Sequence, residues 1–172
     1  GNVGKEFFNQ LQNQRKHLQE DSDIRLNIIA ISNSTNMALK EDHIESNDSD
    51  ILGDEQPTNI LKMINHISQS SGAIKVLVDC TTSEDIPNMY KNAFISDIHV
   101  IAANKKGVSG SMDLYQEIMN YSKSTKKSFH YETTAGAGLP FIKTLQDLNM
   151  TGDRVKEIEG VFSGTLSYLF NN

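Results

Sequence analysis

Short apolar runs alternate with amphipathic stretches along residues 1–132, and this alternation constrains the fold more than any other feature. Apolar runs predict strands at residues 25–34, 73–80, 97–105 and 128–132. Apolar residues at helical spacing predict helices at residues 3–20, 58–67, 83–94, 111–124 and 139–148. Strands that alternate with helices in this way indicate an α/β fold with a mostly parallel sheet.

Individual residues mark the starts of two predicted helices. Ser111 is expected to cap the helix at 111–124, and Pro140 is expected in the first turn of the helix at 139–148. Residues 40–56 are acidic and polar, and we expect an exposed, poorly ordered insertion there. Residues 154–162 predict a further strand, and the last residues predict the start of another helix.

Composition excludes several classes of protein. The formal charge of −6 provides no basic face for nucleic acid. No apolar run approaches the roughly 18–20 residues that a membrane span requires. The single cysteine rules out an internal disulfide, and the five histidines lack the spacing of zinc ligands. The chain begins without methionine and ends within an apolar pattern, so we expect it to be a piece of a longer protein.

The first four residues, Gly1, Asn2, Val3 and Gly4, resemble the end of a Gly-x-Gly-x-x-Gly turn. In such a turn Gly1 would let the backbone approach a pyrophosphate, and Gly4 would let the helix pack close to a strand. The alternative is a plain helix start. The next strand ends in residues 32–34, Ser-Asn-Ser, without the carboxylate that commonly binds the ribose of NAD, so the choice between NAD and NADP stays open. An ordinary Asn/Ser turn is the alternative there.

Two further strand ends carry polar residues. The motif VDCTTSE contains Asp79 and Thr81, and AANKK contains Lys105. Ligands of open α/β sheets bind at the carboxyl ends of the strands, so Thr81 could line a nucleotide and Lys105 could reach a substrate oxygen. The alternatives are a structural acceptor role for Asp79 and a solvated loop charge at Lys105. Cys80 is expected to be a small buried side chain.

The loop YETTAGAGLP, residues 131–140, allows three interpretations. Its small residues could cradle a phosphate before a helix. Glu132 and exposed loop carbonyls could instead face a cation, because hard cations prefer oxygen ligands. The third interpretation is a tight crossing between domains.

Taken together, AANKK, YETTAGAGLPFIKTLQDL, the pair Gly152–Asp153 and EGVFSGTLSYLFN closely resemble homoserine dehydrogenase, including the dehydrogenase half of bifunctional aspartokinase–homoserine dehydrogenases. The resemblance covers nearly the whole chain apart from the acidic insertion. It implies an NAD(P)-dependent enzyme of threonine and methionine biosynthesis that interconverts L-homoserine and L-aspartate 4-semialdehyde.

The resemblance also implies an architecture. Residues 1–138 would form a Rossmann-type, doubly wound, mostly parallel α/β domain without its first strand. Residues 139–172 would begin an α+β substrate and dimerisation domain. A homodimer or homotetramer of the complete protein, in the cytoplasm or a plastid, is implied as well.

The resemblance assigns roles to individual residues. Gly1, Asn2, Val3 and Gly4 would lie in the phosphate turn, Thr81 in the nucleotide loop and Lys105 at the junction of cofactor and substrate. A sodium ion would be bound mainly by backbone carbonyls of Glu132, Ala135, Ala137 and Leu139. The family's main acid/base group and acidic substrate-binding residues lie beyond this chain, so we expect the chain by itself to be inactive.

Overall fold

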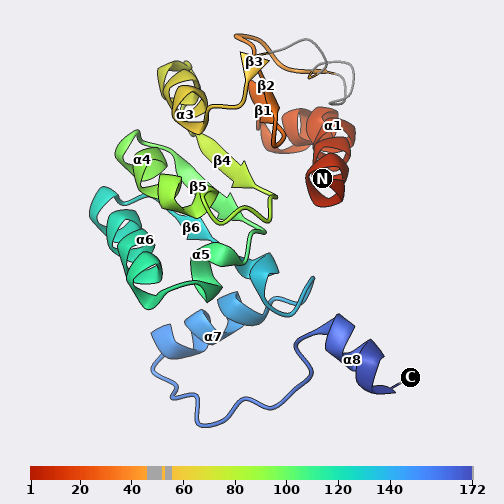
Figure 1. Ribbon diagram of the computed structural model, residues 1–172, viewed down its shortest axis with the longest axis vertical. Coiled ribbons are helices and arrows are strands. Elements are labelled where there is room, and N and C mark those ends of the chain that lie inside the picture. The colour runs from red at the N-terminus through yellow and green to blue at the C-terminus, as the bar shows by residue number, and fades with distance from the viewer. Residues whose placement is uncertain (46–51, 53–55, 172) are drawn as a thin grey trace.

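A three-stranded parallel sheet lies at the centre of the computed structural model, which describes residues 1–45, 52 and 56–171 (Figure 1). The sheet consists of β4 (Val76–Asp79), β5 (His99–Ala102) and β6 (Phe129–His130), in the order β4-β5-β6. Val76 pairs with His99, and Val100 pairs with Phe129, both in parallel register. The α/β class and the parallel pairing predicted from the alternation are therefore confirmed.

Helices cover one face of this sheet. They are α3 (Ile60–Gln69), the 3₁₀ helix η1 (Ile86–Met89), α4 (Tyr90–Ile95) and α6 (Met112–Thr125). The core between helices and sheet contains Ile64, Ile67, Leu77, Tyr90, Ala93, Phe94, Ile98, Val100, Ala102 and Ile118. Val76 and Ile101 point to the other face and are 39% and 38% exposed, so that face is incompletely covered.

Local capping explains two helix starts. The Ser111 Oγ accepts the Leu114 amide at 3.2 Å, which confirms the predicted cap of α6. Asn59 caps α3 in the same way, by accepting the Lys62 amide at 3.0 Å. Each cap satisfies an amide that has no partner within its own helix.

The N-terminal part forms a separate antiparallel sheet. After α1 (Asn2–Ser22), the strands β1 (Ala30–Ser32), β2 (Asn36–Leu39) and β3 (Gln56–Pro57) pair in the order β1-β2-β3. The sequence predicted one strand over 25–34 and missed β2. The missed strand is explained by a tight turn at residues 33–35, which folds the chain back onto β1.

The acidic insertion is only partly described, because residues 46–51 and 53–55 lie outside the described residues. Ile44 and Leu52 are only 3% and 4% exposed, and the Leu52 carbonyl accepts the Asn36 side-chain amide at 2.8 Å. The predicted full exposure is therefore wrong at these two positions. Their apolar side chains are buried by folding back on the N-terminal part.

The remaining elements follow β5 and β6. They are α5 (Lys106–Ser109), the 3₁₀ helix η2 (Glu132–Thr134), α7 (Phe141–Met150) and α8 (Gly164–Asn171). Pro140 is the N-cap of α7 and therefore lies just before its predicted place in the first turn. The helix predicted at the end of the chain is confirmed.

The strand predicted over 154–162 is wrong, because this segment has no strand pairing and runs as an extended loop from α7 to α8 (Figure 1). A strand is stabilised by hydrogen bonds to a neighbour, and no described segment lies alongside this one to supply them.

Candidate functional site

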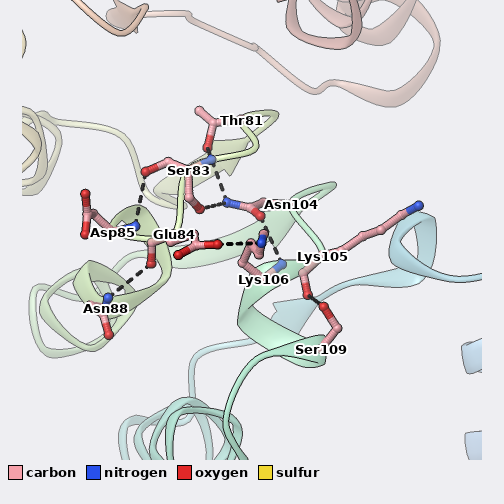
Figure 2. A network of polar contacts seen from close by, with 9 residues as sticks. All are labelled: Thr81, Ser83, Glu84, Asp85, Asn88, Asn104, Lys105, Lys106 and Ser109. Carbon is pink, nitrogen blue, oxygen red and sulfur yellow. Dashed lines mark hydrogen bonds and ion pairs between the residues drawn. The ribbon is translucent and has the colours of Figure 1, made fainter.

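The carboxyl ends of β4 and β5 bring two predicted loops together. Asp79 pairs with Ala102, and the Asp79 carbonyl accepts the amides of Ala103 and Asn104 at 2.8 and 3.3 Å. The loop with Thr81 and the turn with Lys105 therefore leave the sheet at the same edge (Figure 2). This is the edge at which open α/β sheets bind ligands.

The buried Asp79 side chain links the two loops at this edge through hydrogen bonds. Its carboxylate is 3% exposed and accepts the Thr81 amide at 2.8 Å, the Tyr90 hydroxyl at 2.6 Å and the Asn104 side-chain amide at 3.0 Å. Burial, followed by the charge of Asp79, raises the pKa of the Tyr90 phenol far above its usual range. This geometry favours the structural acceptor role of Asp79.

The two neighbouring lysines of AANKK differ in their contacts. The Lys106 ammonium forms an ion pair with Glu84 at 2.6 Å, whereas the Lys105 ammonium has no hydrogen-bond or ion-pair partner among the described residues. Figure 2 shows the Lys105 side chain extending away from the bonded side chains. Lys105 is thus the lysine available to a ligand.

The start of α1 lies beside the end of β4. A Cβ atom placed on Gly4 would lie 3.4 Å from the Cβ of Cys80, which is an ordinary contact distance, so packing alone does not require glycine at this position. Gly1 is the N-cap and supplies no capping side chain. The first-turn amides of Asn2, Val3 and Gly4 consequently have no acceptor among the described residues, and a helix N-terminus of this kind attracts anions.

Cys80 is half-buried between these elements. Burial, and then the charge of Asp79, raises the pKa of its thiol. A thiol with a raised pKa stays protonated and is a poor nucleophile. This supports the interpretation that Cys80 is not a nucleophile, whereas its side chain is less buried than expected.

The turn after β1 is closed by Asn33. Its Oδ1 accepts the amides of Thr35 and Asn36, both at 2.8 Å, and the Thr35 hydroxyl at 3.0 Å. These bonds favour the ordinary-turn interpretation of residues 32–34.

The loop after β6 contains an arrangement that the sequence did not predict. The carboxylate of Glu132 accepts the amide of Ile142 at 2.7 Å and that of Lys143 at 2.8 Å, one on each oxygen. Glu132 therefore caps α7, whose N-cap, Pro140, provides no side-chain hydrogen bond. The signal available in the sequence was a carboxylate located shortly before a helix that begins with proline.

The small residues of this loop adopt left-handed backbone conformations, with φ of 69° at Gly136 and 53° at Ala137. The Leu139 carbonyl accepts the Phe141 amide at 2.8 Å, and the Glu132 carbonyl accepts the Ala135 amide at 3.4 Å. The four residues expected around sodium share one loop. In the described part of the chain, no three His, Cys, Asp or Glu side chains gather around a possible metal position.

The fold and this edge define a class, the nucleotide-binding α/β domains of Rossmann type. A family model described as "Homoserine dehydrogenase, NAD binding domain" matches residues 1–132, and one described as "Homoserine dehydrogenase" matches residues 140–172. The chain belongs to the homoserine dehydrogenase family and contains its NAD-binding domain. Among the described residues, no helix has the length and apolar character needed to cross a membrane.

Curated relatives support this assignment. A maize chloroplastic bifunctional aspartokinase/homoserine dehydrogenase is 40% identical over 175 residues and covers all of this chain, which spans 19% of that protein. A Schizosaccharomyces pombe homoserine dehydrogenase is 36% identical over 186 residues, which include 99% of this chain and 46% of that protein. The chain thus spans less than half of the length of either relative.

Solved structures agree on the fold. A Candida auris protein of unknown function superposes with a TM-score of 0.79 at 26% identity, over 94% of this chain and 45% of that one. A hyperthermophilic archaeal homoserine dehydrogenase in complex with NADPH has a TM-score of 0.54 at 22% identity, over 78% of this chain and 44% of that one.

Proposed function

We propose that the complete protein interconverts L-homoserine and L-aspartate 4-semialdehyde with NAD or NADP. The observation that carries the proposal is that Thr81 and Lys105, whose ammonium has no described partner, share one edge in a chain that matches two homoserine dehydrogenase models. The nicotinamide dinucleotide bound at this edge would supply the hydride acceptor, and oxidation of the homoserine alcohol to the aldehyde would release the hydroxyl proton.

The residues of this chain would bind the dinucleotide and orient the substrate beside it. The free amides of Asn2, Val3 and Gly4 at the start of α1 would hold the pyrophosphate, with Gly1 leaving room for its approach, since no atom lies within 4 Å of a Cβ placed there. Thr81 would contact the dinucleotide. The Lys105 ammonium would stabilise charge that develops on the substrate oxygen. The main acid/base group is contributed from outside this chain.

The test is the initial rate of L-homoserine oxidation by the complete protein, with NAD and NADP compared side by side. We expect turnover with at least one of them, and the ratio of the two rates gives the cofactor preference. A folded protein that binds either dinucleotide but does not oxidise homoserine would refute the substrate assignment and point to another dehydrogenase of a small amino-acid carbonyl. Binding without any turnover of such substrates would favour a non-catalytic nucleotide-binding module.

We also propose that backbone carbonyls of Glu132, Ala135, Ala137 and Leu139 bind sodium. The support is their place in one tight loop, in which the left-handed conformations of Gly136 and Ala137 turn successive peptides. The rate of homoserine oxidation should rise when sodium chloride replaces choline chloride at equal ionic strength. Equal rates in the two salts would remove sodium from the proposal.

The domain boundary is proposed between residues 138 and 139. It is supported by the two family models, which match residues 1–132 and 140–172. Limited proteolysis of the complete protein should cleave near this loop before it cleaves within β4 or β5.

A homodimer or homotetramer of the complete protein is part of the proposal, and light scattering of the purified protein tests it. The compartment is proposed to be the cytoplasm, or a plastid for a plant-like source, since the maize relative is named chloroplastic. Imaging of a fluorescent fusion tests this assignment.

A further inference from the structure

A buried side chain, Asn104, joins the loop after β4 to the turn after β5. Asn104 is 1% exposed. Its amide nitrogen lies 3.0 Å from Asp79 Oδ2, 2.9 Å from the Ser83 carbonyl and 3.2 Å from Thr81 Oγ1 (Figure 2). Its amide oxygen accepts the Lys106 amide at 3.0 Å.

These partners determine the orientation of the Asn104 amide. The Ser83 carbonyl can only accept a hydrogen bond, and the Lys106 backbone N–H can only donate one. The nitrogen must therefore face Ser83 and the oxygen must face Lys106. Reversing the amide would leave buried polar groups without partners, which is costly.

The same contacts determine the direction of the Thr81 hydroxyl. Its oxygen accepts the Ser83 backbone amide at 3.2 Å and lies 3.2 Å from the Asn104 amide nitrogen, which shares its two N–H groups among Thr81, Asp79 and Ser83. Both of these nitrogens can only donate, so the hydroxyl proton of Thr81 cannot point at either of them. No acceptor for the proton is found among the described residues, and Thr81 is exposed at the edge of the sheet. The hydroxyl proton is therefore directed away from these nitrogens, where it can be donated to a ligand.

Asn104 also holds the backbone beside Lys105. The amide that follows Lys105 is bonded to Asn104, and the Lys105 carbonyl accepts the amides of Val108 and Ser109 at 3.0 and 2.8 Å. The backbone of Lys105 is thus fixed on one side by Asn104 and on the other by α5, while its ammonium contacts no partner in the described part of the chain. The buried Asn104 side chain therefore contacts both Thr81 and the backbone next to Lys105.

We propose that Asn104 is a positioning residue that turns the Thr81 hydroxyl outward as a hydrogen-bond donor to an acceptor oxygen of the bound nicotinamide dinucleotide. This inference rests on the proposed function. It predicts that the contributions of Asn104 and Thr81 to dinucleotide affinity are coupled, because the first acts through the second.

The test is a double-mutant cycle in the complete protein, with the Kd of NADPH measured from its fluorescence. Thr81→Val removes the donor, and we expect about a tenfold weaker Kd, since one hydrogen bond is lost. Asn104→Ala should weaken the Kd by about the same factor. The double variant should also be about tenfold weaker than wild type, because the two changes remove one interaction.

A merely structural Asn104 would give a different result. Its loss would then add to that of Thr81, the double variant would be about a hundredfold weaker, and the proposal would be overturned. Asn88→Ala is the matched control. The Asn88 amide donates to the Glu84 carbonyl of the same loop at 3.2 Å without touching Thr81, so its loss should leave the Kd unchanged.

Thermal unfolding shows whether each variant is folded. If Asn104→Ala does not fold, the pair Thr81→Ser and Thr81→Val tests the proposal. Thr81→Ser keeps the hydroxyl and should bind NADPH like wild type, whereas Thr81→Val should bind about tenfold more weakly. Equal binding by Thr81→Val and wild type would overturn the proposal.

The cycle separates this inference from the proposed function. A wild-type protein that binds NADPH but does not oxidise homoserine refutes the proposed substrate, and the coupling of Asn104 and Thr81 is still measured by the Kd. A wild-type protein that binds neither NADPH nor NADH overturns both, and one that binds only NADH is measured in the same cycle with NADH.

Discussion

The parallel sheet with its helices and the segment after residue 138 both contain many apolar side chains, but they bury them differently. Phe94 of α4 is 1% exposed, whereas Phe170 of α8 is 83% exposed. No described residue from 139 to 171 is buried. Figure 1 shows the chain after α7 running away from the rest and ending in α8.

This difference in exposure shows that a helix can form locally without its apolar side chains being packed into a core. Residues of α7 and α8 form helices because their hydrogen bonds lie within each helix. Burial of a side chain requires a second surface that packs against it. In this segment the rings of Phe141 and Phe162 pack against each other, with centroids 5.0 Å apart. Since packing of an amphipathic face supplies most helical stability, the segment should depend on further packing partners.

The largest effect should be seen when the 172-residue chain is assayed by itself. We expect its rate of homoserine oxidation to be at least about a thousandfold below that of the complete protein, because an unpacked segment cannot hold reacting groups in position. Dinucleotide binding, which we assign to the packed region, should persist. A rate of NADP or NAD reduction by the purified chain that approaches the rate of the complete protein would contradict this expectation.

Matched substitutions of phenylalanine test the packing difference directly. Phe94→Ala should lower the free energy of unfolding by about 3–5 kcal/mol, because it leaves a cavity in the core. Phe170→Ala should change it by no more than about 0.5 kcal/mol, because the ring is already exposed in this chain. Urea unfolding of the two variants gives both values, and equal losses would contradict the comparison.

Lys105→Ala in the complete protein should have the next largest effect. We expect kcat for homoserine to fall about a hundredfold, because the ammonium would stabilise charge that develops on the substrate oxygen. Lys106→Ala is the control, since its ammonium is paired with Glu84, and it should retain most of kcat. An unchanged kcat in Lys105→Ala would remove this residue from the mechanism.

The smallest effect should come from pH. Burial lowers the pKa of His43 and of His99, and the Nδ1 of each ring accepts a backbone amide, from Ile28 at 2.9 Å and from Ser128 at 3.0 Å. Because the folded pKa lies below the unfolded value of about 6.5, the unfolded chain binds more protons as the pH falls through that value.

Stability should therefore decrease at acid pH. We expect the urea midpoint to be lower at about pH 5.5 than at about pH 7.5, and substituting both histidines by glutamine should reduce the difference. The residues after 138 contain no histidine, so this effect belongs to the region before them. A midpoint that does not change between the two pH values would count against it.

The sequence by itself determined the strands of the parallel sheet, the helices around it and two positions of the site. Apolar periodicity located the strands of the parallel sheet and the helices around it, and Ser111 marked the start of α6. Thr81 and Lys105 follow their strands directly, so the direction of a parallel sheet was enough to place them at one edge. Periodicity and strand direction are short-range properties that a sequence displays directly.

Only the tertiary structure decided which side chains are paired. Asn104 contacts Asp79 across 25 positions of the chain, and Lys106 contacts Glu84 across 22, whereas the Lys105 ammonium has no partner within the described ranges. Such partners are chosen by the three-dimensional packing of the loops, so the motif AANKK could not distinguish its two lysines. The strand predicted at 154–162 failed for the same reason, because the apolar pattern was present but no described segment pairs with it.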